Sequence, residues 1–221
     1  MPRPEDERLR TRLKELAGKY KRWGSPRIHK LLRKEGAVKN HKRTERIYAE
    51  EKLQIRRRKR KKMARLPRVA RPRPTAPDQA WSMDFVHDWL LTKRKLKCLT
   101  IVDDFTKESI GILVGHSISG AEVARHLASL SRRPKLLRSD NGSEFGSNAF
   151  RDWIDSTEIE HDFITPGKPN ENAFIESFNS RFRDECLNEH VFRSIEDAKW
   201  KIKEWENTYN EIHPHSALGM Q

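Results

Sequence analysis

The sequence of 221 residues contains few cysteines and no long apolar segment. Its two cysteines, Cys98 and Cys186, lie far apart and form neither a C-x-x-C zinc pair nor a disulfide framework, so we expect reduced thiols and no zinc site. No run of residues is apolar enough to span a bilayer, and residues 1–20 are charged where a signal peptide would be apolar. The composition therefore excludes a disulfide-stabilised secreted domain and an integral membrane protein, and we expect a soluble cytoplasmic chain.

Positive charge is abundant but unevenly distributed. The formal net charge is +14. Residues 1–80 contain 28 Lys and Arg against 9 Asp and Glu, a balance of +19, and the remainder contains 18 against 23, a balance of −5. A polyanion attracts the first part by counterion release, whereas divalent cations collect in the mildly acidic second part. The two parts are therefore expected to have different tasks.

The first part has apolar residues at helical spacing in three short stretches, residues 5–18, 26–35 and 41–52. Three basic helices joined by tight turns predict a small helix-turn-helix-like DNA-binding domain over residues 1–65. The alternative is a plain three-helix bundle whose charged face is merely solvated.

An uninterrupted run of seven cations follows the third helical stretch. Like charges in succession repel one another and stay extended unless phosphates neutralise them, so we interpret the run as a DNA-contacting arm, the alternative being a solvated charge run. The arm consists of Arg56, Arg57, Arg58, Lys59, Arg60, Lys61 and Lys62.

Prolines at four positions after the arm then predict a stiff linker over residues 66–77.

From Trp81 onward, short β-branched segments alternate with helical ones. This order predicts an α/β fold in residues 78–221, namely a ribonuclease-H-like mixed five-stranded sheet flanked by helices. The expected strands are residues 81–89, 97–103, 110–116, 135–137 and 159–164, and the expected helices are residues 119–131, 146–156 and 171–188.

Three acids in this second part, Asp84, Asp140 and Glu176, are the candidate catalytic residues, and 35 residues separate the last two. An Asp on a central strand, an Asp at the end of the neighbouring strand and a Glu on a helix could meet at one point and hold two Mg²⁺ ions, for which Mn²⁺ can substitute. Each acid also has a simpler interpretation. The rivals of Asp84 are Asp88, Asp103 and Asp104, Asp140 begins an Asp-Asn-Gly turn, and Glu176 could form a surface ion pair with Arg183.

Several motifs resemble those of one known family. Trp-Ser-Met-Asp-Phe at 81–85, Val-Asp-Asp-Phe-Thr at 102–106, Ser-Asp-Asn-Gly at 139–142 and Gly-Lys-Pro-Asn-Glu-Asn-Ala-Phe-Ile-Glu-Ser-Phe-Asn at 167–179 are similar to the second-frame product of bacterial insertion sequences of family three. These proteins are DDE transposases and resemble retroviral integrases.

The resemblance implies specific roles for individual residues. Asp84, Asp140 and Glu176 would be the catalytic, metal-binding triad, and Arg183 would contact substrate DNA near the cleavage site. The segment 167–172, with Lys168 and Asn172 as DNA contacts, would close over the DNA.

The leading hypothesis is therefore a transposase that cleaves and joins DNA strands. Its expected partners are double-stranded DNA with terminal inverted repeats, target DNA, further copies of the chain on DNA and a protein from the upstream frame. The expected location is the bacterial nucleoid. A second hypothesis is a truncated, catalytically inactive DNA-binding remnant, and a third is a ribonuclease-H-like nuclease for hybrids or junctions.

Overall fold

A computed structural model describes residues 4–55, 73–164 and 173–212 of the protein. The chain forms two compact units that divide near residues 64 and 65. We call the first the helical unit and the second the core unit, and each is described by itself.

The helical unit contains α1 (Pro4–Lys19), α2 (Ser25–Lys34) and α3 (His41–Glu50), which confirms the predicted helices to within about two residues at each end. Pro26 stands in the first turn of α2, and the side chain of Asn40 caps α3 by accepting a hydrogen bond from the Lys42 N–H at 2.9 Å. Gly36, with φ of +71°, ends α2 in the left-handed conformation that glycine adopts most easily. The buried core of the unit consists of Leu9, Leu13, Leu16, Trp23, Ile28, Leu32, Val38, Ile47 and Tyr48.

The core unit is built on one mixed five-stranded sheet with the order β3-β2-β1-β4-β5. β1, β2 and β3 form an antiparallel meander, and β4 and β5 add parallel strands beyond β1. This architecture confirms the predicted ribonuclease-H-like fold class. The strands are β1 (Ala80–Trp89), β2 (Lys95–Asp103), β3 (Ser109–Gly115), β4 (Leu136–Ser139) and β5 (Glu160–Phe163).

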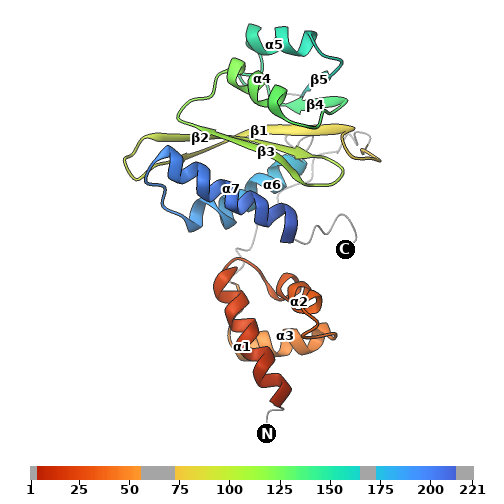
Figure 1. The fold of residues 1–221 in the computed structure, drawn as a ribbon, viewed down its shortest axis with the longest axis vertical. Coiled ribbons are helices and arrows are strands. Elements are labelled where there is room, and N and C mark those ends of the chain that lie inside the picture. Colours follow the sequence, from red (N-terminus) through yellow and green to blue (C-terminus); the bar gives the residue numbers. More distant parts are fainter. Residues whose placement is uncertain (1–3, 56–72, 165–172, 213–221) are drawn as a thin grey trace, which may run out of the picture. The chain divides into compact units, whose positions relative to one another are not determined.

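Helices cover both faces of this sheet, as Figure 1 shows. One face packs against α4 and α5, and the opposite face packs against α6 and α7. Because side chains alternate between the faces of a strand, Trp81 and Met83 of β1 join the first layer, and Val86 joins the second. Asp84 is therefore directed toward the α6 face. The helices are α4 (Gly120–Ser129), α5 (Asn148–Asp155), α6 (Ala173–Glu185), the short 3₁₀ helix η2 (Leu187–Glu189) and α7 (Ile195–Ile212).

The sequence-based description found the helix that carries Glu176 but missed the last described helix. The expected helix over 171–188 is shorter in the described residues, since α6 ends at Glu185 and η2 follows, and α7 was not anticipated. Ala198, Ile202, Trp205 and Tyr209 recur three or four residues apart along α7 and are buried against α6 and the sheet. In the part of the chain that the structure describes, no helix is both long and apolar enough to cross a membrane.

Candidate active site

Strand register brings Asp84 and Asp140 together. β1 and β4 run parallel, with Ala80 opposite Leu136 and Ser82 opposite Arg138, an offset of 138 − 82 = 56 positions. Asp140, the residue directly after β4, lies the same 56 positions after Asp84. Neighbouring strands are about 4.8 Å apart, and residues two positions apart share a face. Continued two residues beyond the last paired residues, this register brings Asp140, just past the end of β4, next to Asp84 of β1.

The Asp84 carboxylate is held by neighbours on two other elements. Its Oδ1 accepts a hydrogen bond from the Phe85 N–H at 2.8 Å, and its Oδ2 accepts one from Asn179 Nδ2 of α6 at 2.8 Å. The Thr100 hydroxyl of β2 lies 2.8 Å from Asn179 Oδ1 and 3.0 Å from the main-chain oxygen of Asp84. Asn179 therefore connects α6, which carries Glu176 one turn earlier, to the strand that carries Asp84.

Electrostatics couples all three acids. Burial, together with the negative charges of Asp140 and Glu176, raises the pKa of Asp84 to about 6, against the lowering effect of the hydrogen bonds from Phe85 and Asn179. Partial burial also raises the pKa of Glu176, which lies in the first turn of α6. Asp84 thus lies within electrostatic range of both other acids, and a cation among them would relieve the cost of its charge.

The loop after β4 adopts the predicted turn and also holds Asp140 in place. Oδ1 of Asp140 accepts a hydrogen bond from the Gly142 N–H at 3.0 Å, and Asn141 Nδ2 donates to the main-chain oxygen of Ile164 at 3.0 Å. Farther along the loop, Glu144 forms an ion pair with Lys97 of β2. The turn interpretation and the site interpretation of this motif are therefore compatible.

Two of the three rival acids, Asp103 and Asp104, have structural tasks. Asp103 accepts hydrogen bonds from the main-chain N–H groups of Asp78, Phe105 and Thr106 and pairs with Arg132 at 3.2 Å. These contacts fix the turn between β2 and β3.

Asp104 is fully buried, and its carboxylate pairs with Arg138 at 2.9 Å and accepts a hydrogen bond from the Ser82 hydroxyl at 2.7 Å. Ser82 and Arg138 are the residues two positions before Asp84 and Asp140. A buried ion pair therefore lies beside the two candidate acids and joins their strands, and the sequence analysis did not identify it.

The proposed DNA-contacting residues are only partly described. Arg183 is exposed on α6, and its guanidinium donates to the main-chain oxygen of His87 at 3.1 Å. On a 3.6-residue helix it lies about 20° from Glu176, on the same side of α6. The arm Arg56–Lys62, Lys168 and Asn172 lie outside the described residues.

The ligand chemistry of the three acids fits a hard divalent cation, which prefers oxygen donors. As the side chains are placed, however, no group of three His, Cys, Asp or Glu within residues 4–55, 73–164 and 173–212 forms a metal-binding cluster. The structure thus brings Asp84 and Asp140 near each other, and the charge of Glu176 contributes to the raised pKa of Asp84. A metal centre at these acids is a proposal. Both cysteines, Cys98 and Cys186, are buried free thiols.

Comparison with protein families defines the class of protein. Integrase core domain models match residues 74–169 and 157–221, and an HTH-like domain model matches residues 4–61. In three dimensions the chain is similar to the HTLV-2 integrase catalytic core domain in complex with magnesium, with a TM-score of 0.55, 20% sequence identity, and coverage of 67% of this chain and 96% of that one. At this identity the likeness concerns the fold, which is that of an integrase catalytic core.

Closer relatives define the family. The chain is 47% identical over 222 residues to an uncharacterized 39.2 kDa protein of insertion element IS476 from Xanthomonas euvesicatoria, covering 99% of this chain and 64% of that protein. It is also 47% identical over 220 residues to an uncharacterized 31.7 kDa protein of insertion element IS407 from Burkholderia multivorans, covering 98% of this chain and 79% of that protein. The chain belongs to this insertion-sequence transposase family, and it combines an HTH-like domain with an integrase core.

Proposed function

We propose that the protein catalyses metal-dependent cleavage and transfer of DNA strands at the ends of an insertion sequence. The observation that carries this proposal is the parallel pairing of β1 with β4, which brings Asp84 near the residue after β4, Asp140, together with the effect of both Asp140 and Glu176 on the pKa of Asp84. Three carboxylates coupled in this way on an integrase fold suit phosphodiester chemistry.

Within this proposal, Asp84, Asp140 and Glu176 hold two Mg²⁺ or Mn²⁺ ions. Bound there, the ions would activate a water or a 3′-hydroxyl for attack and stabilise the leaving oxygen. Asn179 orients the Asp84 carboxylate, since it donates to one oxygen and leaves the outer lone pairs available. No covalent protein intermediate is needed, because water and then a DNA hydroxyl are the nucleophiles.

The DNA contacts form the second part of the proposal. Residues 1–65 bind double-stranded DNA at the terminal inverted repeats, residues 66–77 act as a linker, and residues 78–221 act on the repeat and on target DNA. Arg183 is exposed on the same side of α6 as Glu176, which places its charge where a phosphate beside the acids could contact it. Since two element ends must be joined, the working form is an oligomer on DNA, with a protein from the upstream frame as a further partner.

A strand-transfer assay tests the proposal. A labelled duplex carrying the element's terminal repeat is incubated with a supercoiled target plasmid, with Mg²⁺, Mn²⁺ or EDTA, and with wild type or Asp140→Asn. We expect metal-dependent joined products with the wild type and a loss of at least about 1000-fold in the variant, because a lost metal ligand removes several kcal/mol of transition-state stabilisation. Equal activity of the two proteins would refute the assignment of Asp140.

One observation favours a second candidate function. Since the described side chains form no closed metal-binding cluster, a protein that binds DNA without cutting it is the alternative. Duplex binding without nicking in either metal would support this alternative. Cleavage of RNA–DNA hybrids in preference to the terminal repeat would instead indicate a ribonuclease-H-like nuclease.

A further inference from the structure

The hairpin formed by β1 and β2 extends past the neighbouring strands of the sheet. Among the described strands, β3 pairs with β2 no farther than Lys97, and β4 pairs with β1 no farther than Ser82. The last residues of the hairpin therefore pair only with each other. Figure 1 shows the connection between β1 and β2 at the end of the core unit where α7 begins. We call residues 89–95 the hairpin tip.

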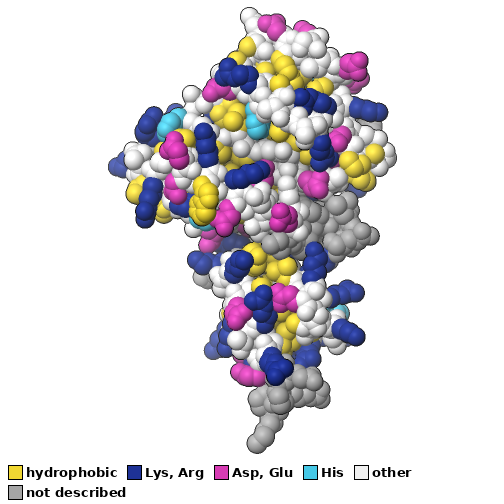
Figure 2. All heavy atoms as spheres, viewed as in Figure 1, with side chains coloured by type: hydrophobic (Ala, Val, Ile, Leu, Met, Phe, Trp, Pro, Cys, Tyr) yellow, Lys and Arg dark blue, Asp and Glu magenta, His cyan; other side chains and the backbone are white. Residues whose placement is uncertain are grey.

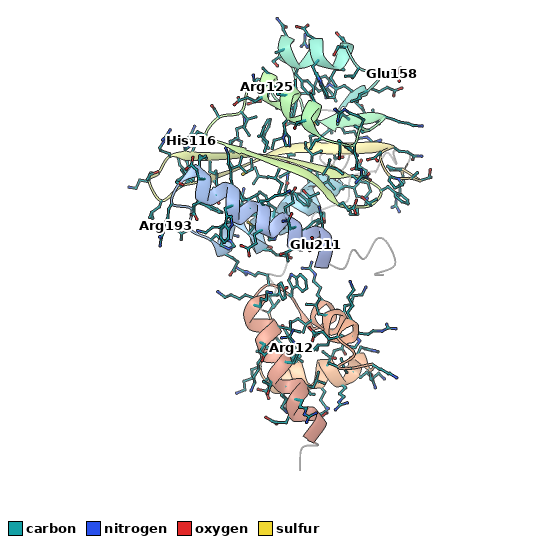
Figure 3. All side chains as sticks on the ribbon, viewed as in Figure 1. Arg12, His116, Arg125, Glu158, Arg193 and Glu211 are labelled. Carbon is teal, nitrogen blue, oxygen red and sulfur yellow. The ribbon has the colours of Figure 1, made fainter. Side chains whose placement is uncertain are left out.

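The hairpin tip is cationic, although the second part of the chain is mildly acidic. Residues 89–97 contain four cations and no acid, whereas residues 81–221 contain 18 cations against 23 acids. Lys93, Arg94 and Lys95 follow one another and are all exposed. Figure 2 shows Lys and Arg side chains, with some acidic ones among them, at the end of the core unit where Figure 3 labels His116. The His116 Nδ1 lies 2.9 Å from the main-chain oxygen of Lys95.

Two large apolar side chains are exposed beside these cations. Trp89 is 58% exposed and Leu91 is 66% exposed. Trp89 lies directly opposite Lys95 across the hairpin, and residues opposite each other in a strand pair share a face. Proteins bind nucleic acids with this combination, in which cations contact phosphates and an aromatic ring stacks on a base. Protein–protein interfaces, in contrast, are depleted in lysine, so the tip has the chemistry of a nucleic-acid contact.

Main-chain hydrogen bonds hold the tip in place. The Leu90 N–H donates to the Arg94 oxygen and the Lys93 N–H donates to the Leu90 oxygen, both at 2.9 Å, which closes the turn. The Leu91 N–H donates to the main-chain oxygen of Phe192 at 2.7 Å, which ties the tip to the segment after η2. Lys93, with φ of +61°, has the left-handed conformation for which turns favour glycine or asparagine. Turn formation therefore does not explain a cation at this position.

The tip lies farther along the strand that carries Asp84. Trp89 is 89 − 84 = 5 residues beyond Asp84 in β1, a distance of about 17 Å along an extended strand. Arg183 contacts β1 between these two residues, since its guanidinium donates to the main-chain oxygen of His87 at 3.1 Å. Successive base pairs of a duplex are about 3.4 Å apart, so the tip would reach DNA roughly five base pairs from a phosphate bound at the acids.

We propose that the hairpin tip binds the DNA that flanks the cleavage site, with Lys93, Arg94 and Lys95 on its phosphates and Trp89 stacked on an unpaired base. This inference rests on the proposed function, since it presumes that the core unit acts on DNA. Phosphate contacts orient a protein on DNA without reading its sequence. The tip would therefore align the substrate with the acids, and it would favour DNA that is unpaired about five positions from the cut.

The first test measures how binding of a labelled terminal-repeat duplex depends on salt. The full chain is titrated by fluorescence anisotropy at several NaCl concentrations, and the slope of log Kobs against the logarithm of the salt concentration is compared between variants. The hairpin triple variant Lys93→Gln/Arg94→Gln/Lys95→Gln should lose about 2.7 from the magnitude of the slope, since each phosphate contact contributes about 0.9. At about 0.1 M salt its affinity should fall on the order of 100-fold.

The second test addresses the aromatic contact. Wild type should bind a duplex with an unpaired base about five positions from the cleavage site more tightly than the fully paired duplex, by on the order of 10-fold. Trp89→Ala should lose this preference with little change in the salt slope, because it removes no charge. Trp89→Tyr keeps an aromatic ring and should retain most of the preference.

A matched control removes three exposed cations from another part of the core unit. Arg125→Gln/Arg133→Gln/Lys135→Gln gives the same net charge as the hairpin triple variant. We expect it to change the slope by less than about 1. Circular dichroism melting identifies any variant that fails to fold. The charge-retaining variant Lys93→Arg/Arg94→Lys/Lys95→Arg, expected to keep the wild-type slope, provides a folded comparison.

The possible outcomes separate the inference from the function beneath it. A folded hairpin triple variant with the wild-type slope, or a control that loses as much, overturns the inference while DNA binding stands. Sedimentation velocity without DNA adds a further check, since a tip variant that changes the oligomeric state would identify the tip as a contact between copies and also overturn the inference. A wild-type chain with no salt-dependent duplex binding overturns the proposed function itself.

Discussion

The helical unit and the core unit use charged residues in opposite ways. In the helical unit, charges are mostly exposed, and α2 contains four cations and no acid. In the core unit, the charged groups around the candidate site are buried between strands, as with Asp104 and Arg138, or held by neighbours, as with Asp84. Exposed ion pairs contribute about 0–1 kcal/mol each, whereas a buried charge without its partner is costly. Charges in the first unit thus lie mostly at its surface, several of them in ion pairs, while these groups in the second hold the geometry of the candidate site.

The largest effect on stability is expected when the buried Arg138–Asp104 ion pair is broken. Arg138→Met should lower the free energy of unfolding by about 3–5 kcal/mol, because it leaves Asp104 as a buried charge without its guanidinium partner. The measurement is urea denaturation of the core unit followed by tryptophan fluorescence.

Neighbouring Arg133 is the control for this substitution. It is exposed and, among the described residues, its hydrogen bonds go to main-chain oxygens, so Arg133→Gln should change stability by no more than about 0.5 kcal/mol. Equal effects of the two substitutions would contradict the distinction between buried and exposed charges.

The raised pKa of Asp84 predicts a pH dependence of stability. Its folded-state pKa of about 6 exceeds its usual value of 3.8, so between these pH values the folded state binds more protons than the unfolded state. The contribution of Asp84 therefore stabilises the metal-free chain as pH falls through 6 and destabilises it as pH rises. At pH 7 Asp84→Asn should be more stable than the wild type by up to about 3 kcal/mol, an advantage mostly lost near pH 4.

Denaturation at both pH values, with and without Mg²⁺, checks this expectation. Mg²⁺ should stabilise the wild type and have little effect on Asp84→Asn, because only the carboxylate form supplies a ligand. Asp88→Asn changes another acid of β1 and should show neither effect. A stability difference between Asp84→Asn and wild type that does not vary with pH would count against the coupling of the three acids.

Asn179 provides a smaller and more local test. Asn179→Leu removes the amide that donates to Asp84, and such supporting hydrogen bonds are typically worth about 10–100-fold in metal affinity. Mn²⁺ titration by isothermal calorimetry should show this loss, while Asn179→Asp should restore little because two carboxylates would then repel each other. Asn188→Ala, an exposed asparagine in η2, is the control, and an equal loss there would assign Asn179 a general structural role.

Much of the core fold could be predicted from sequence because its strands are short, apolar, β-branched segments and its helices have apolar stripes. Asp84, Asp140 and Glu176 could all be identified as candidates from the sequence, since acids among apolar neighbours require an explanation. The parallel register that places Asp140 beside Asp84 could not be predicted, because pairing between distant strands leaves no local pattern.

The residues that the sequence analysis did not identify have weaker sequence patterns. Thr100 is a polar residue within an apolar strand, and Arg138 is a cation within another, and either could have indicated a buried polar network. Asn179 follows Glu176 by three residues and so shares its side of α6, a spacing that could have identified it. α7 was overlooked although Ala198, Ile202, Trp205 and Tyr209 repeat at helical spacing.

The central claim is that Asp84, Asp140 and Glu176 form one metal-binding site. The most direct test is a crystal of the full chain soaked with Mn²⁺, with data collected at the manganese absorption edge. The account predicts anomalous peaks bound by Asp84 and Asp140, with Glu176 on at least one ion. Manganese bound elsewhere, with none of these three carboxylates as a ligand, would contradict it.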